Sequence, residues 1–313
     1  MTVRQSPVRI DRRKFLIGAA GAATAAGAAA LVGCERAEER GVDWKGELTS
    51  TFIREPVPAT DPDSRLWKKS RPVLVPLTPQ MSALPFRPQP AFPSITVRSL
   101  HDGDRIAFLL TWEDADADHL TIKTDQFRDA CGVLLGPGDA PAVFYMMGTA
   151  DVPASIMCWR ADWQKDIDEG YQDLEVAFPN VAFDYYPPFP KAERPLRISD
   201  EYPAEGRPWL VGWNAGNSLS VPSKPSPVEK LIGRGPGTLT HLPAQDATGK
   251  GVWAEGRWKV VLSRPFDASN EGETALQAGK DYAVVFSVWS GSAGDRGSRK
   301  SPSGMGKLHI EGT

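Results

Sequence analysis

"SITVRSLHDGDRIAFLLTWED", Ser94 to Asp114, is the clearest indication of the fold, because it reads as two strands joined by a tight turn. Apolar residues alternate from Ile95 to Leu100 and from Arg105 to Trp112, and "HDGD" separates the two runs. Alternation with a period of two puts apolar side chains on one face of a strand, and Asp-Gly is typical of hairpin turns. The stretch therefore predicts an antiparallel β-hairpin.

The same alternation recurs later in the chain, at Arg257–Phe266 and Asp281–Gly291, and Gly306–Gly312 offers a short last strand. The chain contains 29 Gly and 28 Pro, which limit helices to short pieces. The only predicted helices are "WQKDIDEGYQ" (Trp163–Gln172) and "SPVEKLI" (Ser226–Ile232). We therefore predict an all-β fold, an antiparallel β-sandwich with long loops and a few short helices.

The N-terminal segment has the pattern of an export signal. A twin arginine in "DRRKFLIG" precedes an Ala/Gly-rich apolar run that ends in "LVGC" at Cys34. This order is typical of twin-arginine (Tat) signals, and "LVGC" resembles a lipobox, in which the cysteine is lipidated. We predict a signal at residues 1–34, a tether at 35–48 and a folded domain at 49–313, at the periplasmic or extracytoplasmic face of the membrane. A signal cleaved elsewhere, without a lipid on Cys34, fits the same residues.

Composition and spacing exclude several classes of function. The formal net charge of −3 gives no indication of a nucleic-acid partner. There is no phosphate loop between a strand and a helix and no G-x-S-x-G nucleophile motif. Apart from Cys34, only Cys131 and Cys158 are present, too few for a four-cysteine zinc or iron–sulfur site. A disulfide between these two and a pair of buried thiols both fit the sequence.

Two segments have an unusual composition. "FYMMGTADVPASIMCWRADW" (Phe144–Trp163) holds three methionines, a cysteine and two tryptophans in twenty residues. We predict that Met146 and Met147 end a strand, where alternation would send them to opposite faces, and that one thioether faces a metal or cofactor. Packing in the core is the alternative. The second segment, Val288–Ile310, is a Gly/Ser/Arg-rich loop with Lys300 between Arg299 and Ser301; most loop lysines are solvated.

Several motifs, taken in order, resemble the haem b-binding γ subunits of the dimethyl sulfoxide reductase family of molybdenum enzymes. Members of this group are the γ subunits of ethylbenzene dehydrogenase, dimethyl sulfide dehydrogenase, selenate reductase and chlorate reductase. The motifs are RPVLVPLTPQ, LLTWED, FRDACGVLL, MMGTADVPASIMCWRADWQ, AGNSLS, SPVEKLIGRGPGTLT, GKGVWAEGRWKVVLSRPF, YAVVFSVWSG and GSRKSPS. The resemblance covers most of the mature chain and implies a β-sandwich related to carbohydrate-binding modules.

The resemblance also implies one haem b, whose iron is held by a methionine sulfur and a lysine amine. The family's methionine stands immediately before a glycine, which matches Met147 in this sequence. Its lysine stands in a Gly/Arg-rich loop before Ser-x-Ser, which matches Lys300. Met146 and Met157 remain alternative sulfur ligands.

Further contacts of the cofactor are implied beside these ligands. Family members have Trp-x-Trp where this chain has Met157-Cys158-Trp159, so Trp159 is the aromatic contact that carries over. Arg299 is an implied partner of a haem propionate, since guanidinium groups pair well with carboxylates. Alternatively, Arg296 and Arg299 would favour loss of the proton from Lys300 through like-charge repulsion.

By this resemblance the chain is an electron-transfer subunit without catalytic residues. Its implied partners are a molybdopterin α subunit, an iron–sulfur β subunit, a soluble cytochrome c or similar carrier, and the membrane through a lipid anchor. Composition leaves an alternative of another class, a secreted ligand- or carbohydrate-binding lipoprotein on the same sandwich, because ten tryptophans suit sugar stacking. A Soret absorbance band of the purified protein would distinguish the two.

Overall fold

The computed structural model describes residues 41–180, 211–215, 217, 220–221 and 224–313. The segment from Val42 to Thr313 forms one compact unit. The folded unit therefore includes residues 42–48, which we had predicted to belong to the tether. Cys34 and the twin arginines lie outside the described residues. Within the described part of the chain, no helix has the length and apolar character needed to cross a membrane.

One β-sheet, here called the first sheet, has the strand order β10-β11-β5-β4, with β3 on β4 and β1 on β3. Its strands are β1 (Val42–Asp43), β3 (Val73–Pro76), β4 (Ser94–His101), β5 (Arg105–Glu113), β10 (Thr248–Ala254) and β11 (Arg257–Pro265). Strands β4 and β5 are the hairpin predicted from the alternation of Ser94–Asp114, with Thr96 opposite Thr111. The prediction of this hairpin is confirmed.

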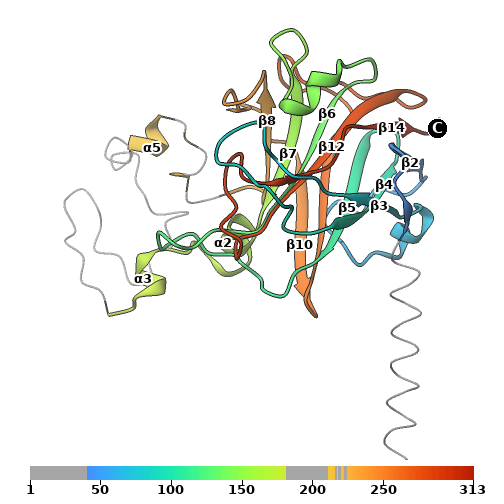
Figure 1. Ribbon diagram of the computed structural model, residues 1–313. Helices are drawn as coiled ribbons and strands as arrows, with labels where there is room; N and C mark the ends of the chain where they lie inside the picture. Colours follow the sequence, from blue (N-terminus) through green and yellow to red (C-terminus); the bar gives the residue numbers. More distant parts are fainter. Residues whose placement is uncertain (1–40, 181–210, 216, 218–219, 222–223) are drawn as a thin grey trace, which may run out of the picture. The chain divides into compact units, whose positions relative to one another are not determined.

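The second sheet has the order β14-β12-β6-β7-β8-β9, with β13 on β12. Figure 1 labels β14, β12, β6, β7 and β8 of this sheet. Its strands are β6 (Ala130–Pro137), β7 (Ala154–Arg160), β8 (Val228–Gly233), β9 (Thr240–His241), β12 (Asp281–Trp289), β13 (Ser301–Pro302) and β14 (Gly306–Ile310). Strand β2 (Glu47–Phe52) joins the sheets, because its first part pairs with β14 and its end with β4. Both of these pairings are parallel, as is that of β1 with β3, so the sandwich is antiparallel except at these strands.

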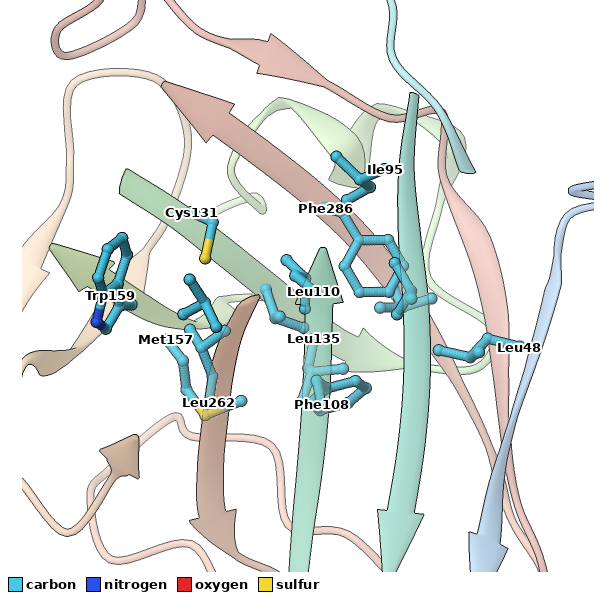
Figure 2. Packing of buried hydrophobic residues seen from close by; sticks show 14 of the residues in the cluster. Leu48, Ile95, Phe108, Leu110, Cys131, Leu135, Met157, Trp159, Leu262 and Phe286 are labelled. Carbon is cyan, nitrogen blue, oxygen red and sulfur yellow. The ribbon is translucent and has the colours of Figure 1, made fainter. Parts of the chain in front are cut away.

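The main core lies between the two sheets. Phe108 of β5 and Phe286 of β12 face each other across it, with ring centroids 6.3 Å apart, and both are fully buried (Figure 2). Alternation along each strand supplies one row of apolar side chains to this interior. The predicted all-β sandwich is thereby confirmed.

Among the described residues, helices are few and short, as the sequence predicted. They are the 3₁₀ helices η1 (Arg65–Lys69) and η2 (Ala142–Met146) and the α-helices α2 (Ala161–Glu169), α3 (Leu174–Ala177) and α5 (Val211–Asn214). Helix α2 confirms the prediction at Trp163–Gln172. The helix predicted at Ser226–Ile232 is wrong, because this segment forms β8 between β7 and β9. Neighbouring strands on both sides satisfy its backbone, which overrides the local helical pattern.

Candidate functional site

The second sheet has an outer face, turned away from the main core, and this face carries a second buried cluster. Alternation in β7 sends Ile156 and Cys158 to the outer face, and Met157 and Trp159 into the interior between the sheets. The buried members of the cluster are Leu134, Phe144, Ala154, Ile156, Cys158, Leu231, Ala283 and Val285. Met147 and Trp289 are partly buried and pack against it.

Met147 reaches this face from a turn and not, as predicted, from the end of a strand. It follows the last residue of η2 and has a left-handed backbone, with φ 79° and ψ 32°. The preceding Phe144 is fully buried over Gly136, where a Cβ would lie 2.0 Å from the Phe144 ring. The backbone oxygen of Met147 accepts a hydrogen bond from the Gly235 amide at 3.1 Å. A positive φ is uncommon outside glycine, so the surrounding contacts must hold this turn.

Lys300 reaches the same place from the hairpin that follows β12. Its amine donates a hydrogen bond to the sulfur of Met147, at 3.3 Å, and lies 5.3 Å from the centre of the Trp289 ring. The indole nitrogen of Trp289 in turn donates to the backbone oxygen of Gly297, at 2.9 Å, which ties the hairpin to the strand. The structure thus brings together Met147 and Lys300, the two residues that the sequence proposed as a pair.

The amine of Lys300 has an unusual environment for a lysine. Burial lowers its pKa to about 8, while the nearby Cys158 acts in the opposite direction. Within the described part of the chain, Lys300 forms no salt bridge, and a thioether is only a weak hydrogen-bond acceptor. With a pKa near 8, roughly one amine in ten is neutral at pH 7, compared with fewer than about one in a thousand for an ordinary lysine. The site therefore offers a nitrogen lone pair beside a sulfur.

The arginines of this hairpin have other partners. Arg299 donates to the backbone oxygen of Phe86 at 2.9 Å, and its Nε lies 3.4 Å from a carboxylate oxygen of Asp295. Arg296 stacks over the ring of Phe127, 4.9 Å from its centre. The low pKa of Lys300 is caused by burial, so our prediction that the charges of these arginines lower it is not supported.

The remaining candidates from the sequence lie elsewhere. Met157 is 2% exposed and belongs to the main core, together with Leu262 and Trp159 (Figure 2). Trp159 is fully buried there, and its indole nitrogen donates to the Gln164 side chain at 3.3 Å. The structure thus does not bring Met157 or Trp159 to the pair. Met146 is the half-buried last residue of η2, and the sulfur in contact with Lys300 is that of Met147.

The two cysteines occupy opposite faces of the second sheet. Cys131 points into the main core and Cys158 lies under the outer face, and both are free thiols. Side chains on opposite faces of one sheet cannot form a disulfide. Burial raises the pKa of both thiols, so they are protonated near neutral pH.

Trp289 and Cys158 are parts of the site that we had not assigned from the sequence. Strand register would have identified them: Trp289 and Ser287 of β12 pair with β6, which pairs with β7, and this register places them on the same face of the sheet as Cys158.

Among the described residues there is no group of three or more His, Cys, Asp or Glu side chains that would hold a metal ion. What the pair offers is one soft sulfur and one amine nitrogen, a donor set suited to iron or copper in a cofactor.

A protein-family model described as "Ethylbenzene dehydrogenase" matches residues 64–183 and 234–301, and these ranges include both Met147 and Lys300. A Haloferax mediterranei protein provisionally named as a respiratory nitrate reductase haem subunit is 24% identical over 77% of this chain. This chain spans 65% of the length of that relative.

Two further relatives are named as γ subunits. Dimethylsulfide dehydrogenase subunit γ of Rhodovulum sulfidophilum is 23% identical over 78% of this chain and 71% of its own length. Chlorate reductase subunit γ of Ideonella dechloratans is 22% identical over 93% of both chains. Among solved structures, a family 9 carbohydrate-binding module of Caldicellulosiruptor kristjanssonii in complex with glucose aligns with 85% of this chain and 96% of its own, at 8% identity and a TM-score of 0.38.

Proposed function

The chain belongs to the ethylbenzene dehydrogenase family, and from this membership we propose that it is a non-catalytic electron-transfer subunit that binds one haem b between Met147 and Lys300. The observation that carries the proposal is the 3.3 Å contact between the sulfur and the amine. A lysine half-buried against a thioether and an indole gains little stability there, since neither is a strong acceptor. As a pair of iron ligands, the same two groups have a chemical role.

Met147 and Lys300 are the residues that would hold the haem iron, and their donor atoms suit it. A thioether is a soft ligand that favours ferrous iron, and a lysine ligates only as the neutral amine. Burial of Lys300 already favours the neutral form, because it lowers the pKa to about 8. Bound haem b would supply one-electron transfer between its ferric and ferrous states. If both Met147 and Lys300 hold the iron, a substrate would have no place on it, so the chain would carry electrons without catalysing a reaction.

The proposal extends to the partners and the location of the chain. We propose that the chain works with a molybdopterin α subunit and an iron–sulfur β subunit, and exchanges electrons with a cytochrome c or similar carrier. The names of the relatives support a subunit of a reductase or dehydrogenase complex. The N-terminal pattern supports Tat export to the periplasmic or extracytoplasmic face and a lipid on Cys34.

The alternative of a carbohydrate-binding lipoprotein receives less support. The tryptophans whose side chains the structure describes are buried or half-buried, and Trp258 contacts both Trp112 and Trp159 in the core. Sugar stacking needs an exposed aromatic face. The indole nearest the site, Trp289, lies beside the Lys300 amine.

The test is an absorption spectrum of the chain purified from a strain that exports and assembles it. We expect a Soret band and a low-spin spectrum, and Lys300→Ala should convert it to a high-spin or mixed spectrum by removing one of the two residues that would hold the iron. Lys307→Ala removes a solvent-exposed lysine from β14 and should leave the spectrum unchanged. A correctly folded wild-type chain without a Soret band would overturn the proposal, and binding of oligosaccharides by that chain would establish the alternative.

A further inference from the structure

The loop after β3 contains a glutamine whose buried side chain makes several hydrogen bonds. Gln80 is 8% exposed. Its backbone pairs with that of Arg87 through two hydrogen bonds, of 2.9 and 2.7 Å, which close the segment between them into a loop. Three exposed apolar side chains line this loop, Met81, Leu84 and Phe86, so apolar packing contributes little to its shape. Polar contacts must determine it.

The side-chain amide of Gln80 supplies most of these contacts. Its oxygen accepts from the backbone amides of Ser82, at 2.6 Å, and Ala83, at 2.9 Å. Its nitrogen donates to the backbone oxygen of Ala83, at 2.7 Å, and lies 3.4 Å from that of Pro85. These bonds fold the loop around the glutamine.

A further bond of the same nitrogen leaves the loop. It donates to the backbone oxygen of Ser298, at 2.7 Å, across 218 residues of sequence. Ser298 stands two residues before Lys300, in the hairpin that brings the amine to Met147. The Gln80 side chain is therefore a direct link between the folded loop and the lysine hairpin.

This link is one of a series of hydrogen bonds, here called the seam, that join the loop after β3 to the lysine hairpin. The Ser298 hydroxyl donates to the backbone oxygen of Leu84, and Arg299 donates to that of Phe86. Beyond Lys300, the Ser301 hydroxyl accepts from the Ala91 amide at 2.8 Å. In the seam, the amide of Gln80 is buried and bonded on both sides, so its loss would leave the backbone oxygen of the half-buried Ser298 without this donor.

We propose that Gln80 is a positioning residue for Lys300: its amide holds the hairpin at Ser298 so that the lysine amine stays at the sulfur of Met147. This proposal rests on the proposed haem site, in which Lys300 is an iron ligand. A lysine side chain is long and flexible, and its retention at one point depends on how firmly its backbone is held. Gln80 does not contact the pair, so it acts only through the hairpin.

The sharpest variant is Gln80→Glu, because a carboxylate keeps both acceptor bonds inside the loop and loses the donor bonds to Ala83, Pro85 and Ser298. In the haem-loaded chain, we expect imidazole to replace Lys300 more readily, with its affinity for the ferric haem raised about tenfold, equivalent to about 1.4 kcal/mol. Imidazole titration followed in the visible spectrum measures this shift. Gln80→Met, which removes every polar bond of the side chain, should have at least as large an effect.

Gln245→Glu is the matched control. The amide nitrogen of Gln245 also donates to two backbone oxygens, those of Lys230 at 2.8 Å and Leu242 at 2.7 Å, and its oxygen accepts from the Lys230 amide. These bonds join β8 to the segment after β9, away from the lysine hairpin. The control should lose a similar amount of stability and keep the imidazole affinity of the wild type.

A second measurement does not depend on haem. In the haem-free chain, amide hydrogen exchange in residues 296–301 should be about tenfold faster in Gln80→Glu and unchanged in Gln245→Glu. An imidazole affinity within twofold of the wild type, or an unchanged exchange rate in this hairpin, would overturn the positioning role of Gln80. A wild-type chain that binds no haem would instead overturn the proposed function, while the exchange result would still report on the hairpin.

Discussion

The amine of Lys300 lies 3.3 Å from the sulfur of Met147, although 153 residues separate them in the sequence. Each arrives from a turn: Met147 follows η2 with a positive φ, and Lys300 ends the hairpin between β12 and β13. The second sheet is their common support, because Gly148 bridges to Pro153 just before β7, and β6 joins β7 to β12. The contact is thus a product of the sheet and not of either segment alone.

Met147 is expected to be the sulfur ligand. Met147→Ala should convert a low-spin haem spectrum to a high-spin or mixed one, and Met147→His should keep haem with a lower reduction potential, since imidazole stabilises ferric iron better than a thioether does. Visible spectra and a redox titration measure both effects. Met146→Ala is the neighbouring control and should retain the low-spin spectrum. If Met146→Ala abolishes that spectrum while Met147→Ala keeps it, the ligand assignment is wrong.

Met157 is expected to contribute to stability alone. It is 2% exposed inside the main core, so Met157→Ala should lower the free energy of unfolding by about 2–5 kcal/mol through lost burial and a cavity. Urea unfolding monitored by circular dichroism gives this difference. Met81→Ala, at a side chain 54% exposed, should change the stability by less than about 0.5 kcal/mol. A haem spectrum altered by Met157→Ala in the folded protein would speak against this separation of roles.

Gly148 is expected to be indispensable for the turn that carries Met147. Its φ is +79°, and a Cβ would lie 2.6 Å from the Ala154 amide nitrogen and 2.7 Å from the Gly233 oxygen. Gly148→Ala should therefore destabilise the chain by about 1–3 kcal/mol and weaken haem binding. Gly304→Ala is the control, because a Cβ at Gly304 meets nothing within 4 Å. Equal unfolding midpoints for the two variants would refute the steric argument.

Asp129 is expected to make stability depend on pH. Burial raises its pKa to about 7, although the amides of Asp118 and Gly291 and the indole of Trp258 donate to its carboxylate. The unfolded group titrates near 4, so the folded state binds the proton more tightly. Its contribution to stability is therefore greatest below about pH 4 and falls by up to about 4 kcal/mol as the pH rises to 7.

The measurement for Asp129 is the free energy of unfolding in urea at several pH values between 4 and 8. In Asp129→Asn, the free energy of unfolding should fall less between pH 4 and pH 8 than in the wild type. The amide can also change the stability by a constant amount, which does not affect this slope. Asp125→Asn neutralises an exposed carboxylate and should reproduce the slope of the wild type. Parallel pH profiles for the wild type and Asp129→Asn would show that Asp129 is ionised throughout.

Cys34 is expected to anchor the mature chain. The order of a twin arginine, an apolar run and "LVGC" motivates the prediction, and Cys34→Ala should move the exported protein from the membrane fraction to the soluble fraction. Fractionation followed by immunoblotting tests this, with Cys131→Ala as the control for loss of a buried thiol. An unchanged distribution would mean that the lipid is not the anchor.

Much of the fold could be predicted from local patterns. The alternation of apolar residues from Ile95 to Trp112 was sufficient for the β4–β5 hairpin, because a period of two is a property of neighbouring residues. The same reasoning failed at Ser226–Ile232, where a helical pattern lies in the strand β8. There the pairing with β7 and β9 determines the secondary structure, and a local sequence pattern does not indicate which segments will pair in the fold.

For the site, the sequence provided the identity of the pair, because the motifs around Met147 and Lys300 resemble those of a family with methionine and lysine ligands. Its geometry came from tertiary structure. Phe144 packs closely over Gly136 just before the left-handed turn at Met147, and the Gln80 amide and the Trp289 indole donate hydrogen bonds to the backbone of the lysine hairpin. The low pKa of Lys300 also depends on tertiary structure. It is caused by burial, and the Lys300 amine is buried only when segments distant in the sequence pack around it.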